Sequence, residues 1–280
     1  MELSYAPLTP WIPGRLPGMS PLEPSEWLHR DAAFAPQMAY RDRLLEERGD
    51  IVLMGEGCDG AGELLDHVLA TIAAHDPGYR VGAEAVTRPD GVTVPLDRAR
   101  PLATLGRLVQ EDLLVLHKEG AEHVLAGAVL IFPSRWSLAE KFGRPLVGIH
   151  ERVPAYDEGL APRVQRLFDA LKPGRPMVRA NYLVHPTPEL HQPKLFTGPK
   201  KESPVTGRYW LRVERQSILR LAESGHCVFS VKTLVTPIEA LTADQRASLA
   251  DALEGQEPSM RDYHGGADFQ GAAVAALRAA

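Results

Sequence analysis

One histidine stands in a segment whose composition would suit a metal-binding imidazole. His150 lies between Ile149 and Glu151 in FPSRWSLAEKFGRPLVGIHERVPAY, which runs from residue 132 to residue 156. An imidazole serves as an axial ligand of haem iron when it is neutral, faces an apolar pocket and has its other ring nitrogen fixed by a hydrogen bond. The neighbouring apolar residues could form that wall, although a packed or surface histidine would show the same pattern. The other nine histidines show no HxH, HxxxH or HExxH spacing, so a site with several histidine ligands is not indicated.

A second group of candidate residues alternates along the expected strand 209–219. Period-two alternation predicts Arg212, Glu214 and Gln216 on one face of this strand and Arg215 on the other. Guanidinium groups bind carboxylates in a bidentate manner, including the propionates of a haem, and Glu214 could accept a hydrogen bond from a cationic amine. The alternative is a solvated sheet face with an internal Arg–Glu pair.

A third expected strand, 177–185, carries Arg179 and Asn181 with Tyr182 beside them. A cationic donor such as Arg179 would polarise an iron-bound O2 and stabilise developing negative charge. An ordinary arginine on an edge strand is the alternative. Cys227 is a further possible iron ligand, but its alternation with apolar residues favours a place in the core.

The helices and strands that the sequence predicts around these residues indicate an α+β fold, in which helices flank a mainly antiparallel sheet. The spacing of apolar residues predicts strands over 51–54, 122–132, 177–185, 209–219 and 226–235, the last two joined by a hairpin turn at 223–225. It predicts helices over 27–48 (kinked or broken at Pro36), 63–74, a short stretch after Ser134 or Ser137 that ends at Gly143, 161–171, 243–253 and 269–279. Residues 108–117 fit a helix or a strand, and 84–104 are expected to form a loop with a turn at Asp90–Gly91. Residues 1–24 are expected to form a proline-rich arm, and 25–280 a single domain.

A glycine-rich segment after the first expected strand resembles a nucleotide-binding motif. Gly55, Gly57 and Gly60 have the spacing of the dinucleotide fingerprint and precede a helix. That fold requires a second parallel strand after the helix, and the turn-rich segment that follows does not predict one. The segment is therefore interpreted as a flexible turn.

Composition narrows the class of protein. The 280 residues carry a net charge of −5, which disfavours a nucleic-acid groove or binding to an anionic membrane surface. No apolar stretch approaches the roughly 20 residues that span a bilayer, and no signal peptide is visible. The two cysteines, Cys58 and Cys227, do not form a disulfide framework or a zinc site. We expect a cytoplasmic, reduced protein, with a homo-oligomer possible.

Four segments together resemble a known family. FPSRWSLAEKFG, IHERVPAY, RANY and LRVERQSILRLAESGHCVFSVKT occur in this order, within a region from about Glu63 to about Tyr263. They resemble the haem-dependent oxidative N-demethylase alpha-subunit family, formerly a domain of unknown function. The resemblance implies a haem-binding PAS-like sheet that holds one side of the iron with a protein ligand and leaves the other side for O2 and substrate.

The resemblance also implies an activity. It implies a monooxygenase-type enzyme that uses haem b and O2 to oxidise a small secondary amine such as dimethylamine to methylamine and formaldehyde. Electrons would come from NADPH through flavin and iron–sulfur carriers in a separate reductase partner. This agrees with a sequence that has neither a cysteine cluster for an iron–sulfur centre nor a convincing nucleotide motif.

Positions that match the family receive the following implied roles. His150 would be the iron ligand, and Arg179 would lie near the bound gas as a catalytic residue. Glu214 would orient the amine cation, and the residues that line or brace the pocket would be Arg212, Arg215 and Gln216.

Two positions depart from the family pattern, which has Pro at the position of Arg152 and Trp at the position of Tyr182. These departures leave two other interpretations open. One is a non-enzymatic haem or gas sensor on the same scaffold, since a fold does not fix a function. The other is a haem-free structural or partner-binding subunit.

Overall fold

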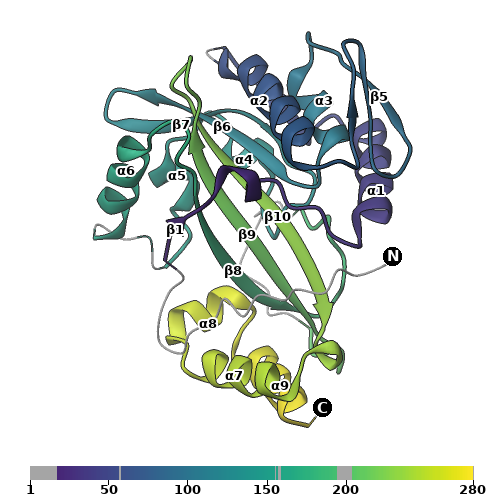
Figure 1. Cartoon of the computed structure of the whole chain (residues 1–280). Coiled ribbons are helices and arrows are strands. Elements are labelled where there is room, and N and C mark those ends of the chain that lie inside the picture. Colours follow the sequence, from purple (N-terminus) through teal and green to yellow (C-terminus); the bar gives the residue numbers. More distant parts are fainter. Residues whose placement is uncertain (1–17, 57, 155, 157–158, 194–203, 280) are drawn as a thin grey trace.

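The computed structural model describes residues 18–56, 58–154, 156, 159–193 and 204–279 (Figure 1). Most of the expected N-terminal arm and Gly57 of the glycine-rich segment lie outside the described residues. Residues 20–21 form an edge strand, β1, and the 3-10 helix η1 (Pro24–Glu26) follows.

A seven-stranded sheet organises the fold. All its neighbouring strands are antiparallel, in the order β1-β8-β9-β10-β6-β7-β2. The strands are β1 (Ser20–Pro21), β2 (Val52–Met54), β6 (Asp112–Glu119), β7 (Glu122–Val129), β8 (Met177–His185), β9 (Trp210–Arg220) and β10 (Cys227–Pro237). A smaller antiparallel sheet contains β3 (Arg80–Val81), β4 (Ala85–Thr87) and β5 (Thr93–Pro95). The prediction of an α+β fold with an antiparallel sheet is confirmed, and β2 pairs antiparallel with β7, unlike a strand of a dinucleotide-binding unit.

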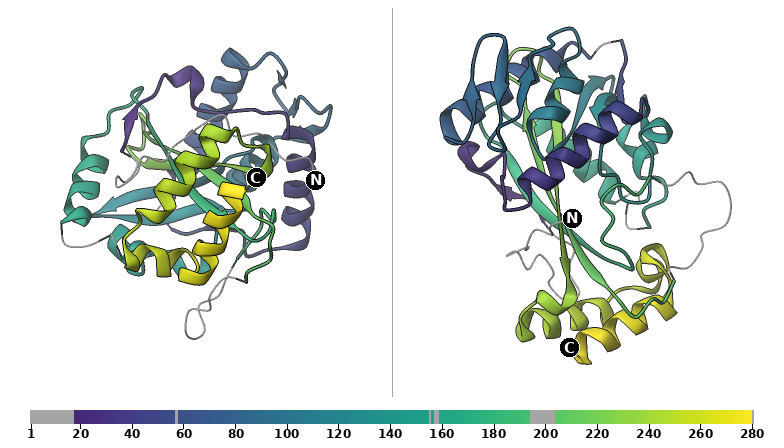
Figure 2. Two further views of the ribbon diagram at one scale, coloured as in Figure 1. Left: turned by 90° about the horizontal axis from the view of Figure 1, so that it is seen from below. Right: turned by 90° about the vertical axis from the view of Figure 1, so that its right-hand side faces the viewer.

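Helices cover both faces of the sheet and one end of it (Figures 1 and 2). They are α1 (Phe34–Glu47), α2 (Gly60–His75), α3 (Pro101–Leu108), α4 (Leu138–Lys141), α5 (Leu146–His150), α6 (Leu160–Ala170), α7 (Ala243–Glu254), α8 (Pro258–His264) and α9 (Ala267–Ala279), with a 3-10 turn η2 (Ile238–Ala240). Helices α1 to α3 lie on one side of the upper body, α4 to α6 lie on the other, and α7 to α9 pack at the far ends of β8, β9 and β10.

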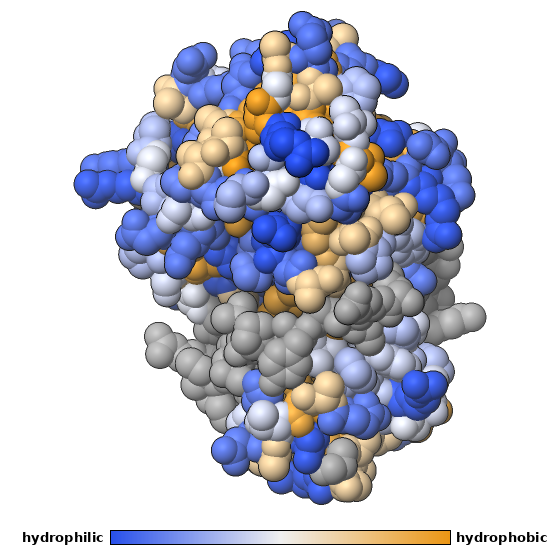
Figure 3. Space-filling model, turned by 45° about the vertical axis from the view of Figure 1, so that its right-hand side comes forward, coloured by the Kyte–Doolittle hydropathy of each residue, from blue (hydrophilic) through white to orange (hydrophobic). Residues whose placement is uncertain are grey.

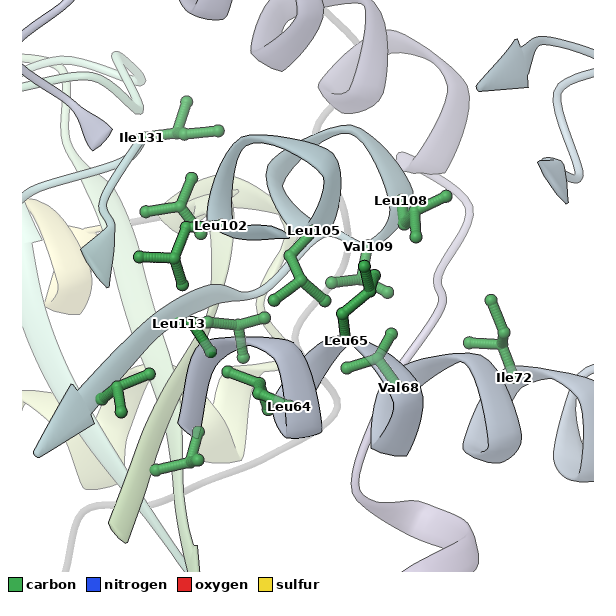
Figure 4. Packing of buried hydrophobic residues seen from close by; sticks show 14 of the residues in the cluster. Leu64, Leu65, Val68, Ile72, Leu102, Leu105, Leu108, Val109, Leu113 and Ile131 are labelled. Atoms are coloured by element: carbon green, nitrogen blue, oxygen red, sulfur yellow. The ribbon is translucent and has the colours of Figure 1, made fainter. Parts of the chain in front are cut away.

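The alternation of β6 shows why the sheet is buried on both faces. Leu113 and Val115 belong to the cluster that α2 and α3 complete, whereas Leu114 and Leu116 point to the cluster beneath α4 to α6. Side chains of α2 and α3 interdigitate above the sheet in the first cluster (Figure 4). Because successive residues of a strand face opposite sides, a strand buried on both faces is apolar throughout.

Several predicted elements differ from the structure. The loop expected over 84–104 was wrong, because this stretch contains β4, β5 and the start of α3. Strands of three residues are too short to show a period, although the turn expected at Asp90–Gly91 is present, with Gly91 at φ +86°. The helix expected from residue 27 begins only at Phe34, with Pro36 in its first turn, where a missing N–H costs little.

The ambiguous segment 108–117 contributes to strand β6, and the strand expected over 122–132 ends at Val129. No helix in the described part of the chain is both long and apolar enough to cross a bilayer. On the face shown in Figure 3, hydrophilic residues surround small apolar patches.

Candidate functional site

Four predicted residues form a hydrogen-bonded chain on one face of β8 and β9. Antiparallel pairing places Arg179 opposite Gln216. Arg179 Nε donates to Gln216 Oε1 at 2.8 Å, and Gln216 Nε2 donates to Glu214 Oε2 at 3.2 Å. The other oxygen of Glu214 accepts from Arg212 Nε at 3.1 Å. We call these four residues the polar ladder.

Arg212 is the buried anchor of the polar ladder, with 1% of its surface exposed. Its Nη2 donates to the carbonyl of Phe132 at 2.6 Å and its Nη1 donates to the carbonyl of Leu190 at 3.1 Å. One guanidinium thus ties β9 to two loops and to the Glu214 carboxylate. This arrangement suits a residue that holds Glu214 in place.

Arg179 has a more open environment. Its side chain is exposed to solvent, yet desolvation by surrounding protein lowers the pKa of its guanidinium, against the opposing effect of Glu214. Protein therefore surrounds the Arg179 guanidinium on most sides, while one side of it is open to solvent. Within the described residues Arg179 donates the single hydrogen bond to Gln216, so its other N–H groups are available to an anion.

His150 ends the short helix α5, and its ring is fixed on two sides. Its Nδ1 lies 2.9 Å from the carbonyl oxygen of Leu146, and the ring stacks on Tyr156 with centroids 4.3 Å apart and planes 14° apart. Because a carbonyl only accepts, Nδ1 carries the proton and the lone pair lies on Nε2. Nε2 has no hydrogen bond to any described residue.

Electrostatics keep this imidazole neutral near pH 7. Desolvation lowers the pKa of His150, and the positive charges of Arg179 and Lys141 lower it further, while the Leu146 carbonyl acts in the opposite direction. Helix α5 lies on the polar-ladder side of the sheet, because Leu146 and Ile149 pack in one cluster with Met177 and Ile218, which share that face of β8 and β9. The structure therefore places His150 on the same side of the sheet as Arg179, Gln216, Glu214 and Arg212.

The sequence analysis missed two further residues that interact electrostatically with the polar ladder, Tyr263 and Arg135. The pKa of Tyr263, on α8, is raised by desolvation and by the negative charge of Glu214, while Arg135 lowers it. Arg135 Nη1 donates to the carbonyl of His264 at 3.0 Å, and the φ of Arg135 is +63°. Helix α8 is too short and too polar to show an apolar period, and Arg135 carried a signal only as part of the FPSRW block.

The structure does not bring Arg215 to the polar ladder. It projects from the opposite face of β9, where Nη1 and Nη2 donate to the carbonyls of Trp27 and Glu26 at 2.9 and 2.6 Å. Cys227 is fully buried in the core, as expected, and desolvation raises the pKa of its thiol to about 11.

The two positions that depart from the family pattern also lie apart from the polar ladder. Arg152 is exposed on the surface beside Glu151. Tyr182 is buried in the cluster that α7 and α9 complete, on the face of β8 opposite to Arg179.

The residues present fit a haem. A haem requires one protein ligand to its iron and cationic groups for its propionates. His150 offers an imidazole whose Nε2 has no hydrogen-bond partner among the described residues, and Arg179 offers unused N–H donors on the same side of the sheet. In the described part of the chain no three His, Cys, Asp or Glu residues gather as they would around a bare metal ion.

The model of one protein family, "Haem-dependent oxidative N-demethylase, alpha subunit-like", matches residues 18–274. The chain belongs to this family. The family name ties these N-demethylase-like proteins to haem and to oxidative chemistry, and the term alpha subunit implies an assembly with other subunits.

Proposed function

We propose that this N-demethylase family member binds haem b through His150 Nε2 and oxidises a small secondary amine with O2. The observation that carries the proposal is the tautomer of His150, whose Nδ1 proton is committed to Leu146 and whose lone pair therefore lies on Nε2. This is the arrangement of a histidine that serves as an iron ligand.

The overall reaction balances with an external supply of two electrons. A dimethylamine-like substrate, O2, two electrons and two protons give the demethylated amine, formaldehyde and water. Bound haem would supply the iron that activates O2 for oxidation of the C–H bond next to nitrogen. A separate reductase partner, drawing on NADPH through flavin and iron–sulfur carriers, would deliver the electrons, and we propose a cytoplasmic location.

Glu214 is proposed to bind and orient the ammonium form of the amine. Each of its oxygens accepts one hydrogen bond, from Arg212 and from Gln216, so each retains capacity for a second. The anchored Arg212 fixes the carboxylate, and the charge of Glu214 acts on Tyr263. A substrate held here would present its methyl group in a fixed direction, which is how positioning lowers a barrier.

Arg179 is proposed to hold negative charge. Its N–H groups that have no partner among the described residues could stabilise negative charge that develops on a bound oxygen, or bind a haem propionate. Gln216 aligns Arg179 and Glu214 through its amide, which donates to one and accepts from the other. Arg215 lies on the opposite face and has no part in this mechanism.

The test is the absorption spectrum of protein purified from haem-supplemented cells, before and after dithionite and CO. We expect a Soret band that shifts on reduction and on CO binding, and that His150→Ala loses. His75→Ala changes an exposed histidine and should retain the band. An unchanged spectrum in His150→Ala would remove His150 as the ligand.

Formaldehyde release with dimethylamine and a chemical reductant separates the enzyme from other uses of the fold. A protein that binds CO but releases no formaldehyde with any small amine would be a gas-binding sensor. A colourless protein that refuses added hemin would be a structural or partner-binding subunit, and both results would contradict the proposal.

A further inference from the structure

A cavity of about 550 Å³ lies on the face of the sheet opposite to the polar ladder. The segment from β1 through η1 crosses in front of β9 and β10 and forms one wall, together with the C-terminal end of α2 and the start of β6 (Figure 1). Arg215 and Leu234 form part of the floor. The volume is that of a site for a small organic molecule.

Glu111 is a buried carboxylate that lines this cavity and has unused hydrogen-bonding capacity. Its exposed fraction is 3%, and one oxygen, Oε1, accepts from the backbone N–H of His29 at 2.8 Å. Its second oxygen accepts no hydrogen bond from the described residues, and Glu111 lines the cavity, so this oxygen has capacity for a donor from solvent or from a ligand. The charges of Arg215 and Lys232 act on the same carboxylate and help to keep it ionised in its buried position.

The cations around the cavity have their best donors engaged. Arg30 forms a bidentate pair with Asp76 at 2.6 and 2.9 Å. Arg215 uses Nη1 and Nη2 for backbone carbonyls, and the ammonium of Lys232 lies 3.1 Å from Asp31. An anion entering the cavity would find no free guanidinium fork and would approach Glu111. These contacts disfavour an anionic ligand.

Two further features favour a cation. Helix α2 spans 16 residues and ends at His75 beside the cavity, and the C-terminal end of a helix carries partial negative charge. Phe34 and Tyr79 meet edge to face, with ring centroids 6.0 Å apart, and both line the cavity. Aromatic rings next to a carboxylate are the groups that bind organic ammonium ions.

We propose that this cavity is a second ligand site, which binds a small organic ammonium ion with an apolar body. The ammonium group would donate to the free oxygen of Glu111 near the end of α2. The apolar body would contact Phe34, Ile72 and Leu234. The site stands apart from the polar ladder and does not depend on haem.

Calorimetric titration of the full-length protein with butylammonium tests the proposal. The titration uses the Glu214→Gln variant as its parent protein, so that binding of the amine at the polar ladder does not contribute to the measured heat. We expect one saturable site, which the additional change Glu111→Gln weakens by roughly tenfold or more, the loss expected for one charge-assisted hydrogen bond. Glu47→Gln is the matched control, since it removes an exposed carboxylate outside the cavity and should leave binding unchanged.

Arg30→Gln gives a second readout of opposite sign. Arg30 is partly exposed and its loss frees the Asp76 carboxylate, so butylammonium should bind severalfold more tightly. Thermal unfolding of each variant establishes that it is folded. The proposal is overturned if butylammonium does not saturate a site, if Glu111→Gln binds it as well as its parent, or if butyrate binds in its place.

Discussion

Replacing the buried arginine of the polar ladder should have a large effect on stability. In Arg212→Met the side chain keeps much of its length but loses its donors to Glu214 and to the carbonyls of Phe132 and Leu190. The Arg212–Glu214 pair has side-chain exposures of 1% and 13%, so solvent cannot replace the lost contacts fully. Removing one partner of a buried ion pair costs about 3–5 kcal/mol.

That loss is a large share of the ~5–15 kcal/mol that stabilises a typical domain. Urea unfolding followed by circular dichroism measures it as a fall in the midpoint at constant slope. The matched control is Arg278→Met, since Arg278 also pairs with two carboxylates, Asp251 and Glu254, but is 46% exposed. The control should lose less than about 1 kcal/mol, as surface ion pairs do.

The reasoning fails if the free energy of unfolding of Arg212→Met lies within about 1 kcal/mol of that of the unchanged protein. It also fails if Arg278→Met loses as much stability as Arg212→Met. Either result would mean that the buried contacts of Arg212 are no more valuable than an exposed pair. It would also remove the argument that Arg212 fixes the position of Glu214.

Two more predictions concern buried groups. Desolvation and nearby arginine charges hold the pKa of the buried His185 well below its usual range. As the pH falls below about 6.5, the unfolded chain therefore takes up a proton at this histidine before the folded protein does. The free energy of unfolding should then decrease with falling pH, by up to ~1.4 kcal/mol per pH unit. Urea unfolding at pH 7.5 and 5.5 should show a smaller loss in His185→Gln than in the unchanged protein or in exposed His75→Gln, and equal losses would contradict the reasoning. A methyl group in Gly127→Ala would overlap Cys58 Sγ and should cost about 1–3 kcal/mol, and a second change, Cys58→Ala, should recover part of that loss in the same assay; no recovery would mean that the strain lies elsewhere.

The sequence predicted the local arrangement of β9 correctly. Arg212, Glu214 and Gln216 share a face and Arg215 lies on the other, as period-two alternation indicated. Helix α2 was equally clear, because its apolar residues recur at helical spacing over four turns. These features depend on neighbours in sequence, so the sequence contains their cause.

Which residues lie next to the ladder residues of β9 is set by contacts between segments that are far apart in the sequence. The register of β8 against β9 places Arg179 beside Gln216, and nothing in either strand alone specifies that pairing. The charge of Glu214 acts on Tyr263 because α7 to α9 pack against the ends of the long strands. His150 could be singled out in the sequence, but its tautomer follows from a hydrogen bond and a stacked ring.

The sequence by itself determined the α+β class, the alternation of the polar ladder and the resemblance to the N-demethylase family, which the family match confirms. Only the tertiary structure decided that Arg179 lies opposite Gln216, that Glu111 is buried beside a cavity, and that η1 forms part of the wall of that cavity. The physical reason is the distance along the chain over which each effect acts. Alternation and helical period act over a few residues, whereas strand register, burial and the pairing of charges arise when segments far apart in the chain pack together.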